Sequence, residues 1–177
     1  MLNGDNIKER IRIYNQFCEY NHKENNINGI LVNWINVFED INNNIILGIT
    51  DTGKWIFAEN NMYYMLDDLK SFLYCSNLLE YSFESIINCL NDRFDFCKDN
   101  RIIYLLFPFQ ELFVFVGTYL INDYWFELAW NWFDQFPIDI QYSFIDLIIK
   151  LKNDNRLSQS NRQKASKFIK RLSKTEI

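Results

Sequence analysis

From about residue 61 to the end of the chain, apolar side chains recur at helical spacing in one segment after another, with short polar breaks between them. Apolar residues that repeat every three to four positions line one face of a helix. Five Gly and two Pro in 177 residues are few for an all-β chain and suit a helical one. This pattern predicts antiparallel helices that stack side by side.

Residues 1–60 are predicted to form two helices and one β-hairpin. Helical spacing marks a first helix that ends at the polar run 21–26, and a second helix over 27–41. The only convincing strand signal is a pair of apolar runs near residues 45–57, on either side of a Thr-Asp-Thr-Gly turn at 50–53. The predicted fold class is therefore all-α, mainly antiparallel stacked helices with a HEAT-like arrangement as one option, plus this small hairpin.

The chain is predicted to be a single helical domain, 1–177, because one hydrophobic core is the default at this length. Residues 1–155 carry 22 acidic and 11 basic side chains, whereas 156–177 carry one acid and seven bases. A body of net charge −11 therefore ends in a segment of net charge +6. Within the domain we distinguish N-terminal helices plus hairpin (1–60), an acidic helical stack (61–155) and a basic C-terminal helix.

Several features predict a cytoplasmic protein. The first residues lack the basic-then-apolar pattern of a signal peptide. The cysteines are Cys18, Cys75, Cys89 and Cys97, and no two form a CxxC pair. Scattered thiols without a secretion signal are typical of a reduced compartment. The apolar stretch 102–121 contains Pro108 and Glu111 near its centre, so we predict a buried core helix and no membrane contact.

The motifs for catalysis and cofactor binding are incomplete. Residues 48–54 fit the GxxxxGK spacing of a phosphate-binding loop, but Trp55 stands where that loop needs Ser or Thr. A hairpin turn explains both glycines, with Gly53 at positive φ. The only histidine, His22, lies in a polar run, and no GxSxG elbow or zinc-ligand spacing occurs. The sequence predicts no enzyme, no catalytic residue, no cofactor and no metal site.

Clustered carboxylates are the remaining candidates for metal binding or acid–base chemistry. They are Asp67, Asp68, Glu80, Glu84, Asp92, Asp95 and Asp99. No calcium-loop motif surrounds them, so a solvated surface explains them best. On a helix, Asp92, Asp95 and Asp99 share one face, and they form our second candidate for a partner-binding surface.

The Trp-rich helix predicted over 122–136 carries the most specific binding signal. At about 100° per residue, Trp125 and Trp132 lie on its core side. The opposite side, which we name the acidic stripe, consists of Asp123, Glu127, Trp130, Asn131 and Asp134. Trp130 is either covered by another helix or anchors an interface, since Trp is over-represented in hot spots and acids steer cationic partners. The acidic stripe is the first candidate for a partner-binding site.

The basic C-terminal helix leaves three interpretations open. Its charges could form a solvated face attracted to the acidic body, contact nucleic acid, or bind an acidic partner or a second copy. A net charge of −5 over the whole chain opposes the binding of a polyanion, so no direct contact with nucleic acid is expected.

Small size, acidity, aromatic-rich helices and the lack of a catalytic motif together resemble the immunity proteins of bacterial toxin–immunity systems, especially those of contact-dependent growth inhibition. The resemblance is one of type. It implies a cytoplasmic toxin inhibitor that binds the C-terminal toxin domain of a matching secreted effector, often a basic nuclease, and blocks its active site. The acidic stripe would then present carboxylates to the toxin's phosphate-binding Lys and Arg.

Three other classes of function stay open. The main alternative is a helical scaffold or adaptor protein, with phage origin as one option, that binds a peptide or a helix. The others are an enzyme of unrecognised type, which would need a deep pocket with two or more acids, and a nucleic-acid-binding regulator.

Overall fold

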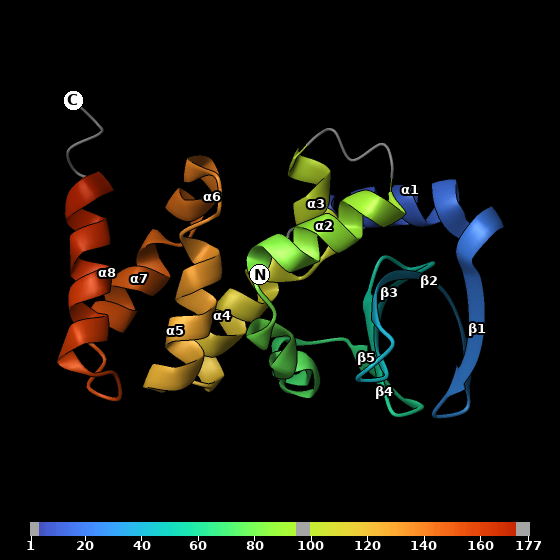
Figure 1. Cartoon of the computed structure of the whole chain (residues 1–177), viewed down its shortest axis with the longest axis horizontal. Helices are drawn as coiled ribbons and strands as arrows, with labels where there is room; N and C mark the ends of the chain where they lie inside the picture. The colour runs from blue at the N-terminus through green and yellow to red at the C-terminus, as the bar shows by residue number, and fades with distance from the viewer. Residues whose placement is uncertain (1–3, 95–99, 173–177) are drawn as a thin grey trace. The chain divides into compact units, whose positions relative to one another are not determined.

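The computed structural model of this chain describes residues 4–94 and 100–172. The chain divides into two compact units, one that ends at Glu111 and one that begins at Leu112 (Figure 1). The boundary falls inside helix α4 (Phe109–Tyr119). Among the described residues, all five strands belong to the first unit.

A five-stranded antiparallel sheet forms the centre of the first unit. The elements in chain order are α1 (Gly4–Asn21), β1 (His22–Ile27), β2 (Ile30–Asp40), β3 (Ile45–Thr50), β4 (Trp55–Glu59), β5 (Met62–Leu66), the 3₁₀ helix η1 (Leu69–Glu80), α2 (Phe83–Arg93), α3 (Asn100–Leu106) and the start of α4. Each strand pairs with its sequence neighbours, in the order β1-β2-β3-β4-β5. The predicted all-α fold class is therefore wrong. The predicted hairpin at 45–57 is confirmed as β3–β4, with Gly53 at φ 73°.

Asparagines at positive φ make two of the turns in this sheet. Asn28 (φ 52°) and Gly29 (φ 83°) connect β1 to β2, and Asn60 (φ 50°) and Asn61 (φ 63°) connect β4 to β5. Two successive residues at positive φ are the backbone requirement of a type I′ hairpin turn, and Asn tolerates this conformation better than most residues. The Asn-Gly pair is a hairpin signal that the sequence analysis missed, because the strand before it is almost entirely polar.

The helix predicted over 27–41 is wrong, because most of this segment forms β2. Trp34 packs against Ile27 and Ile56 on the inner face of the sheet. Its neighbour Ile35, whose side chain points to the other face, is fully buried as well. A strand that is buried on both faces carries a nearly continuous apolar run, and such a run also satisfies helical spacing.

The sheet curls into a half-barrel (Figure 1). Trp34, Ile27 and Ile56 form a buried apolar cluster on its inner face. The ring centroids of Trp34 on β2 and Tyr63 on β5 lie 6.2 Å apart, although β3 and β4 separate these strands in the sheet. Gly48 makes this packing feasible, because a Cβ there would overlap the Trp34 ring and lie 2.6 Å from the Ile35 carbonyl oxygen. The first glycine of the apparent phosphate loop therefore serves close packing inside a strand.

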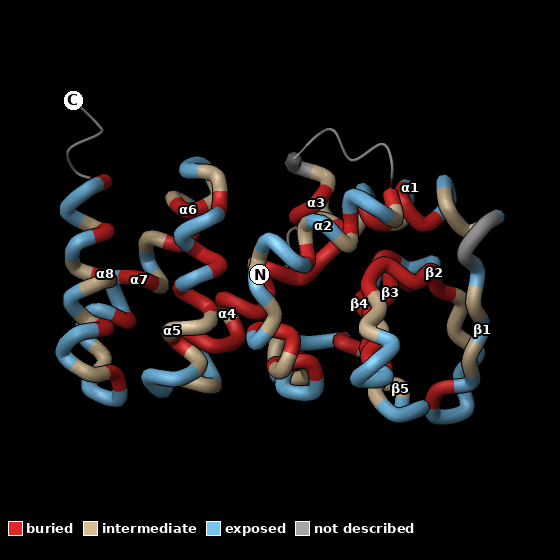
Figure 2. The backbone as a smooth tube through the Cα atoms, in the orientation of Figure 1, coloured by how far each residue is buried: buried red, intermediate tan, exposed pale blue. Residues whose placement is uncertain are grey.

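Helices of the first unit cover the other face of the sheet. Ile13 and Tyr14 of α1 are buried there, and Phe38 of β2 packs edge-on against Tyr81 (5.4 Å between centroids) and Phe107 (5.6 Å). Figure 2 shows β3, at the centre of the sheet, as almost entirely buried. Ser82 caps the start of α2, where its hydroxyl accepts a hydrogen bond from the Ser85 N–H.

The apolar stretch 102–121 is not one helix. It contains most of α3 and all of α4, and Pro108 immediately precedes α4. Pro108 lacks an N–H and disfavours helical backbone at Phe107, which explains the break. In the described part of the chain, no helix is long and apolar enough to cross a membrane.

The second unit follows the predicted helical pattern. It contains the rest of α4, α5 (Asp123–Phe133), α6 (Ile138–Ser143), α7 (Ile145–Lys152) and α8 (Gln159–Leu172). Asn122 caps α5, and its side-chain oxygen accepts a hydrogen bond from the Trp125 N–H at 3.0 Å. The core is aromatic: Phe133 of α5 stacks on Phe113 at 4.6 Å and packs edge-on against Phe168 of α8 at 5.0 Å.

We predict that Gly48→Ala lowers the free energy of unfolding by about 1–3 kcal/mol or more, because the new methyl group overpacks the Trp34 site. Urea unfolding would measure this loss. The control is Gly29→Asn, which has open space and a positive φ that Asn tolerates. Equal stability of Gly48→Ala and wild type would show that the half-barrel interior is loosely packed.

Candidate functional site

The acidic stripe lies on α5, and helix α8 of the same unit packs against it. Asp123 accepts hydrogen bonds from the Ser158 N–H at 2.8 Å and from the Asn161 side chain at 2.7 Å. These two donors hold the pKa of Asp123 below its ordinary value. Asp123 therefore binds the backbone just before α8, where unpaired N–H groups favour a carboxylate.

The centre of the stripe is also engaged by α8. Glu127 forms an ion pair with Lys164. Trp130 is only 4% exposed, and it packs edge-on against Phe168 with ring centroids 6.1 Å apart. Of the two interpretations of Trp130, coverage by another helix is the one that the structure confirms.

The last two residues of the stripe, Asn131 and Asp134, are exposed. Partial burial of the Asp134 carboxylate raises its pKa, and the nearby charge of Arg171 acts against this shift. The acidic stripe thus meets a cationic partner within its own unit, the basic helix α8. Binding of a second protein to the stripe stays a prediction, and it would require α8 to leave Trp130.

The second predicted surface lies only partly in the described chain. Asp92 is exposed on α2, whereas Asp95 and Asp99 lie outside the described residues. No group of three or more His, Cys, Asp or Glu side chains within 4–94 and 100–172 could hold a metal ion.

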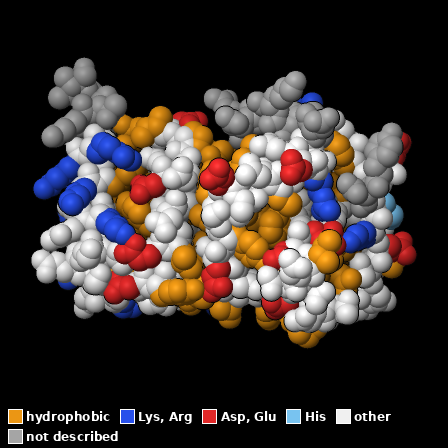
Figure 3. All heavy atoms as spheres, viewed as in Figure 1, with side chains coloured by type: hydrophobic (Ala, Val, Ile, Leu, Met, Phe, Trp, Pro, Cys, Tyr) orange, Lys and Arg blue, Asp and Glu red, His pale blue; other side chains and the backbone are white. Residues whose placement is uncertain are grey.

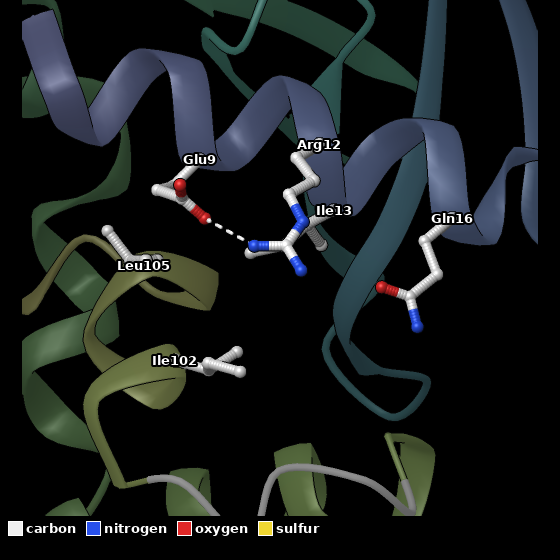
Figure 4. Close-up of a pocket in the computed structure, with 6 residues that line it drawn as sticks. All are labelled: Glu9, Arg12, Ile13, Gln16, Ile102 and Leu105. Carbon is white, nitrogen blue, oxygen red and sulfur yellow. Dashed lines mark hydrogen bonds and ion pairs between the residues drawn. The ribbon is translucent and has the colours of Figure 1, made fainter.

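A shallow groove lies between α1 and α3 in the first unit (Figure 4). Ile13, Ile102 and Leu105 supply apolar lining, and Glu9 and Arg12 form an ion pair across 3.5 Å at its edge. Its volume of about 210 Å³ is below the range of about 300–1,000 Å³ that is typical of small-molecule sites. We therefore do not place a ligand in this groove.

A buried ion pair in the first unit was not predicted. Arg10 of α1 is 1% exposed and contacts the Glu111 carboxylate of α4 at 3.2 Å. The Arg10 Nε–H donates to the Gly53 carbonyl oxygen at 2.7 Å, and the guanidinium lies 5.0 Å from the centre of the Trp55 ring. The indole N–H of Trp55 donates to the same carboxylate at 3.4 Å. A glutamate inside an otherwise apolar run was the signal that could have indicated a buried charge.

Burial opposes both charges of this pair. It raises the pKa of Glu111 and lowers that of Arg10, whereas their mutual attraction acts against both shifts. Every polar contact of the pair is internal, so its role is to hold α1, the β3–β4 turn and α4 together.

A partly exposed aromatic cluster on β5 and η1, in which Tyr64 is half-buried, was not predicted either, because helical spacing was expected from residue 61 onward. The cluster, which we name the tyrosine patch, consists of Met62, Tyr64, Leu73 and Tyr74. The rings of Tyr64 and Tyr74 stack with centroids 4.3 Å apart, and the Tyr64 hydroxyl donates to the Met62 sulfur at 3.6 Å. Met62, Leu73 and Tyr74 are 54%, 57% and 51% exposed.

Three exposed carboxylates lie close to this patch in the sequence, and one of them, Asp67, is paired with Lys54 at 2.6 Å. Exposed Asp67 and Asp68 follow β5, and exposed Glu80 ends η1. Asp68 has a structural role as the N-cap of η1, where it accepts from the Ser71 N–H at 2.9 Å. The segment from β5 to the end of η1 thus carries both large aromatic side chains and exposed acids, the two features predicted together on α5.

No known protein family, curated protein sequence or solved structure matches this chain. The functional inference therefore rests on the surfaces described above.

We predict that Arg10→Met destabilises the protein by about 3–5 kcal/mol, because it leaves the Glu111 charge buried without a partner. Arg12→Met, on the exposed face of the same helix, should cost about 0–1 kcal/mol. Urea unfolding of both variants gives the comparison. Similar losses in the two variants would contradict a structural role for the buried pair.

The decrease in the free energy of unfolding caused by Arg10→Met should depend on pH. Without Arg10, the pKa of Glu111 rises further, since attraction to Arg10 now lowers it. A carboxyl group whose folded-state pKa is raised contributes stability below its unfolded pKa of about 4.3 and loses it as pH rises through the folded pKa. Arg10→Met should therefore be more destabilised, relative to wild type, at pH 8 than at pH 5.

We predict that Phe168→Ala lowers the free energy of unfolding by about 3–5 kcal/mol, because it leaves a cavity against Trp130 and Phe133. Lys167→Ala, at the neighbouring exposed position of α8, should change stability by less than about 0.5 kcal/mol. If both variants unfolded like wild type, α8 would not be packed on α5 in solution.

Proposed function

We propose that this chain is an immunity-type protein, which binds a basic toxin domain through the tyrosine patch and blocks the activity of that domain. The observation that carries this proposal is the stacking of exposed Tyr74 on half-buried Tyr64, in a segment that also contains exposed carboxylates. The resemblance in size, acidity and composition to immunity proteins supports the same class of function.

The chemistry of the tyrosine patch suits a protein interface. Tyrosine and methionine are enriched in interface cores, and tyrosine is one of the residues that most often contribute strongly to binding. Tyr64 also stacks on buried Phe57 at 6.4 Å, so the pair is anchored to the sheet and loses little conformational freedom on binding.

The charge of the first unit selects a basic partner. Residues 1–111 carry 16 acidic and nine basic side chains, a net charge of −7. An acidic surface attracts a basic protein and speeds its association, and this effect weakens as salt is added. A nuclease that binds phosphates through Lys and Arg has the complementary charge.

The tyrosine patch is favoured over the acidic stripe because it is already accessible. Trp130 can reach a partner only after Phe168 and the rest of α8 are displaced, which would expose apolar side chains of both helices. Binding at the tyrosine patch requires no such rearrangement.

We predict that Tyr74→Ala weakens toxin binding by about 30-fold, the effect of losing one hot-spot residue. Affinity capture at low salt from the source organism, followed by titration of the purified captured domain, would measure it. Tyr124→Ala is the matched control, since Tyr124 is 55% exposed in the second unit. Wild-type thermal stability of both variants would exclude misfolding as the cause.

Growth rescue tests the immunity function itself. Cells that express the captured domain should stop growing, and co-expression of this chain should restore growth, less effectively with Tyr74→Ala. A captured protein that is not toxic would refute immunity and favour the scaffold or adaptor alternative. Rescue that is unchanged by Tyr74→Ala would keep immunity and exclude the tyrosine patch as its site.

A further inference from the structure

Helix α8 separates its basic side chains into two sets. Lys164 and Arg171 point toward the rest of the unit, where Lys164 pairs with Glu127 and Arg171 donates to the Gln141 side chain at 3.2 Å. Lys167 and Lys170 are exposed, and Arg162 is half-buried. The inward set is used to hold α8 in place.

The outward set has no comparable internal partner. We name as the basic face Arg162, Lys167 and Lys170 of α8, together with Lys150 and Lys152 at the end of α7. Within residues 4–94 and 100–172, none of these five side chains forms an ion pair or a side-chain hydrogen bond. Helix α8 contains no carboxylate. Figure 3 shows Lys and Arg side chains gathered over α8.

The local charge around the basic face is positive although the chain is acidic. Residues 112–172 carry eight basic and six acidic side chains, a net charge of +2. Asp123 and Glu127 are bound to the inward side of α8, and Asp154 is paired with Arg156 at 2.7 Å. Salt screens charges over about 10 Å at 0.1 M, so an anion at α8 responds mainly to this local charge.

We propose that the basic face binds the phosphodiester backbone of nucleic acid, without sequence preference. Lys and Arg supply most of the affinity in such binding, and exposed Gln159, Ser160 and Gln163 on α8 can donate hydrogen bonds to phosphate oxygens. An anionic membrane is the weaker fit. A helix that lies on a membrane inserts its apolar side, whereas Ala165, Phe168 and Leu172 of α8 are buried in the unit.

Fluorescence anisotropy with the full chain tests this proposal. The probes are a labelled 20-base-pair DNA duplex, a labelled 20-nucleotide single-stranded RNA and vesicles containing phosphatidylserine. We expect dissociation constants of roughly 1–100 µM for nucleic acid at physiological salt, and tighter binding at 50 mM salt. If about three phosphates are contacted, duplex affinity should fall about 40-fold between 50 and 200 mM salt. The two nucleic-acid probes distinguish DNA from RNA as the preferred source of the backbone.

The double variant Lys167→Gln/Lys170→Gln should weaken binding at least about 10-fold and lower the salt slope by about 2, since each phosphate contact contributes about 0.9. The matched control Lys8→Gln/Lys70→Gln removes the same charge from the first unit and should bind like wild type. Thermal unfolding confirms that each variant is folded.

Three outcomes would overturn the proposal: no binding of either nucleic acid at 50 mM salt, equal losses in the two double variants, or binding to vesicles alone. The toxin assays report on the tyrosine patch in the first unit. Failure of nucleic-acid binding therefore leaves the proposed immunity function intact. Failure of the toxin assays likewise leaves the proposed binding of nucleic acid to the basic face intact.

Discussion

The buried contact between Arg10 and Glu111 joins residues that are 101 positions apart in the chain. Removing two charges from water costs several kcal/mol per ion, and only close pairing with additional hydrogen bonds offsets that cost. Here the Gly53 carbonyl and the Trp55 ring and N–H supply the additional contacts. Because each charge is tolerated only when the other is present, α1, the β3–β4 hairpin and the Glu111 turn that ends the first unit must occupy these positions together.

Charged side chains in the second unit also hold two elements together, but they lie nearer the surface. Asp123 and Glu127 use their carboxylates to position α8, and Trp130 fills the space between the two helices. An acidic stripe and a basic helix that look like two separate binding surfaces in the sequence are therefore largely two sides of one internal contact. The outward side chains of α8 and the tyrosine patch of the first unit are among the surfaces that stay exposed in the described residues.

Sequence reasoning predicted the helices of the second unit better than the sheet of the first. Amphipathic helices such as α8 bury only one face. The buried residues Ala165, Phe168 and Leu172 therefore recur at helical spacing, and this repeat is clear in the sequence. Strand β2 is buried on both faces, and its apolar run fits a helix equally well. The candidate site was also predicted only in part. Helical spacing placed Trp130 and Glu127 on one face of a helix, but it could not indicate that α8 covers them.

Features that depend on contacts within a few residues follow from the amino-acid sequence alone. These are the caps at Ser82 and Asn122, the turn at Gly53 and the apolar faces of the C-terminal helices. Only the tertiary structure decided that β2 is a strand, that Trp130 is buried and that Arg10 meets Glu111. Each of these depends on which distant segment packs against the residue. The free energy of burial comes from that segment, and local spacing carries no information about it.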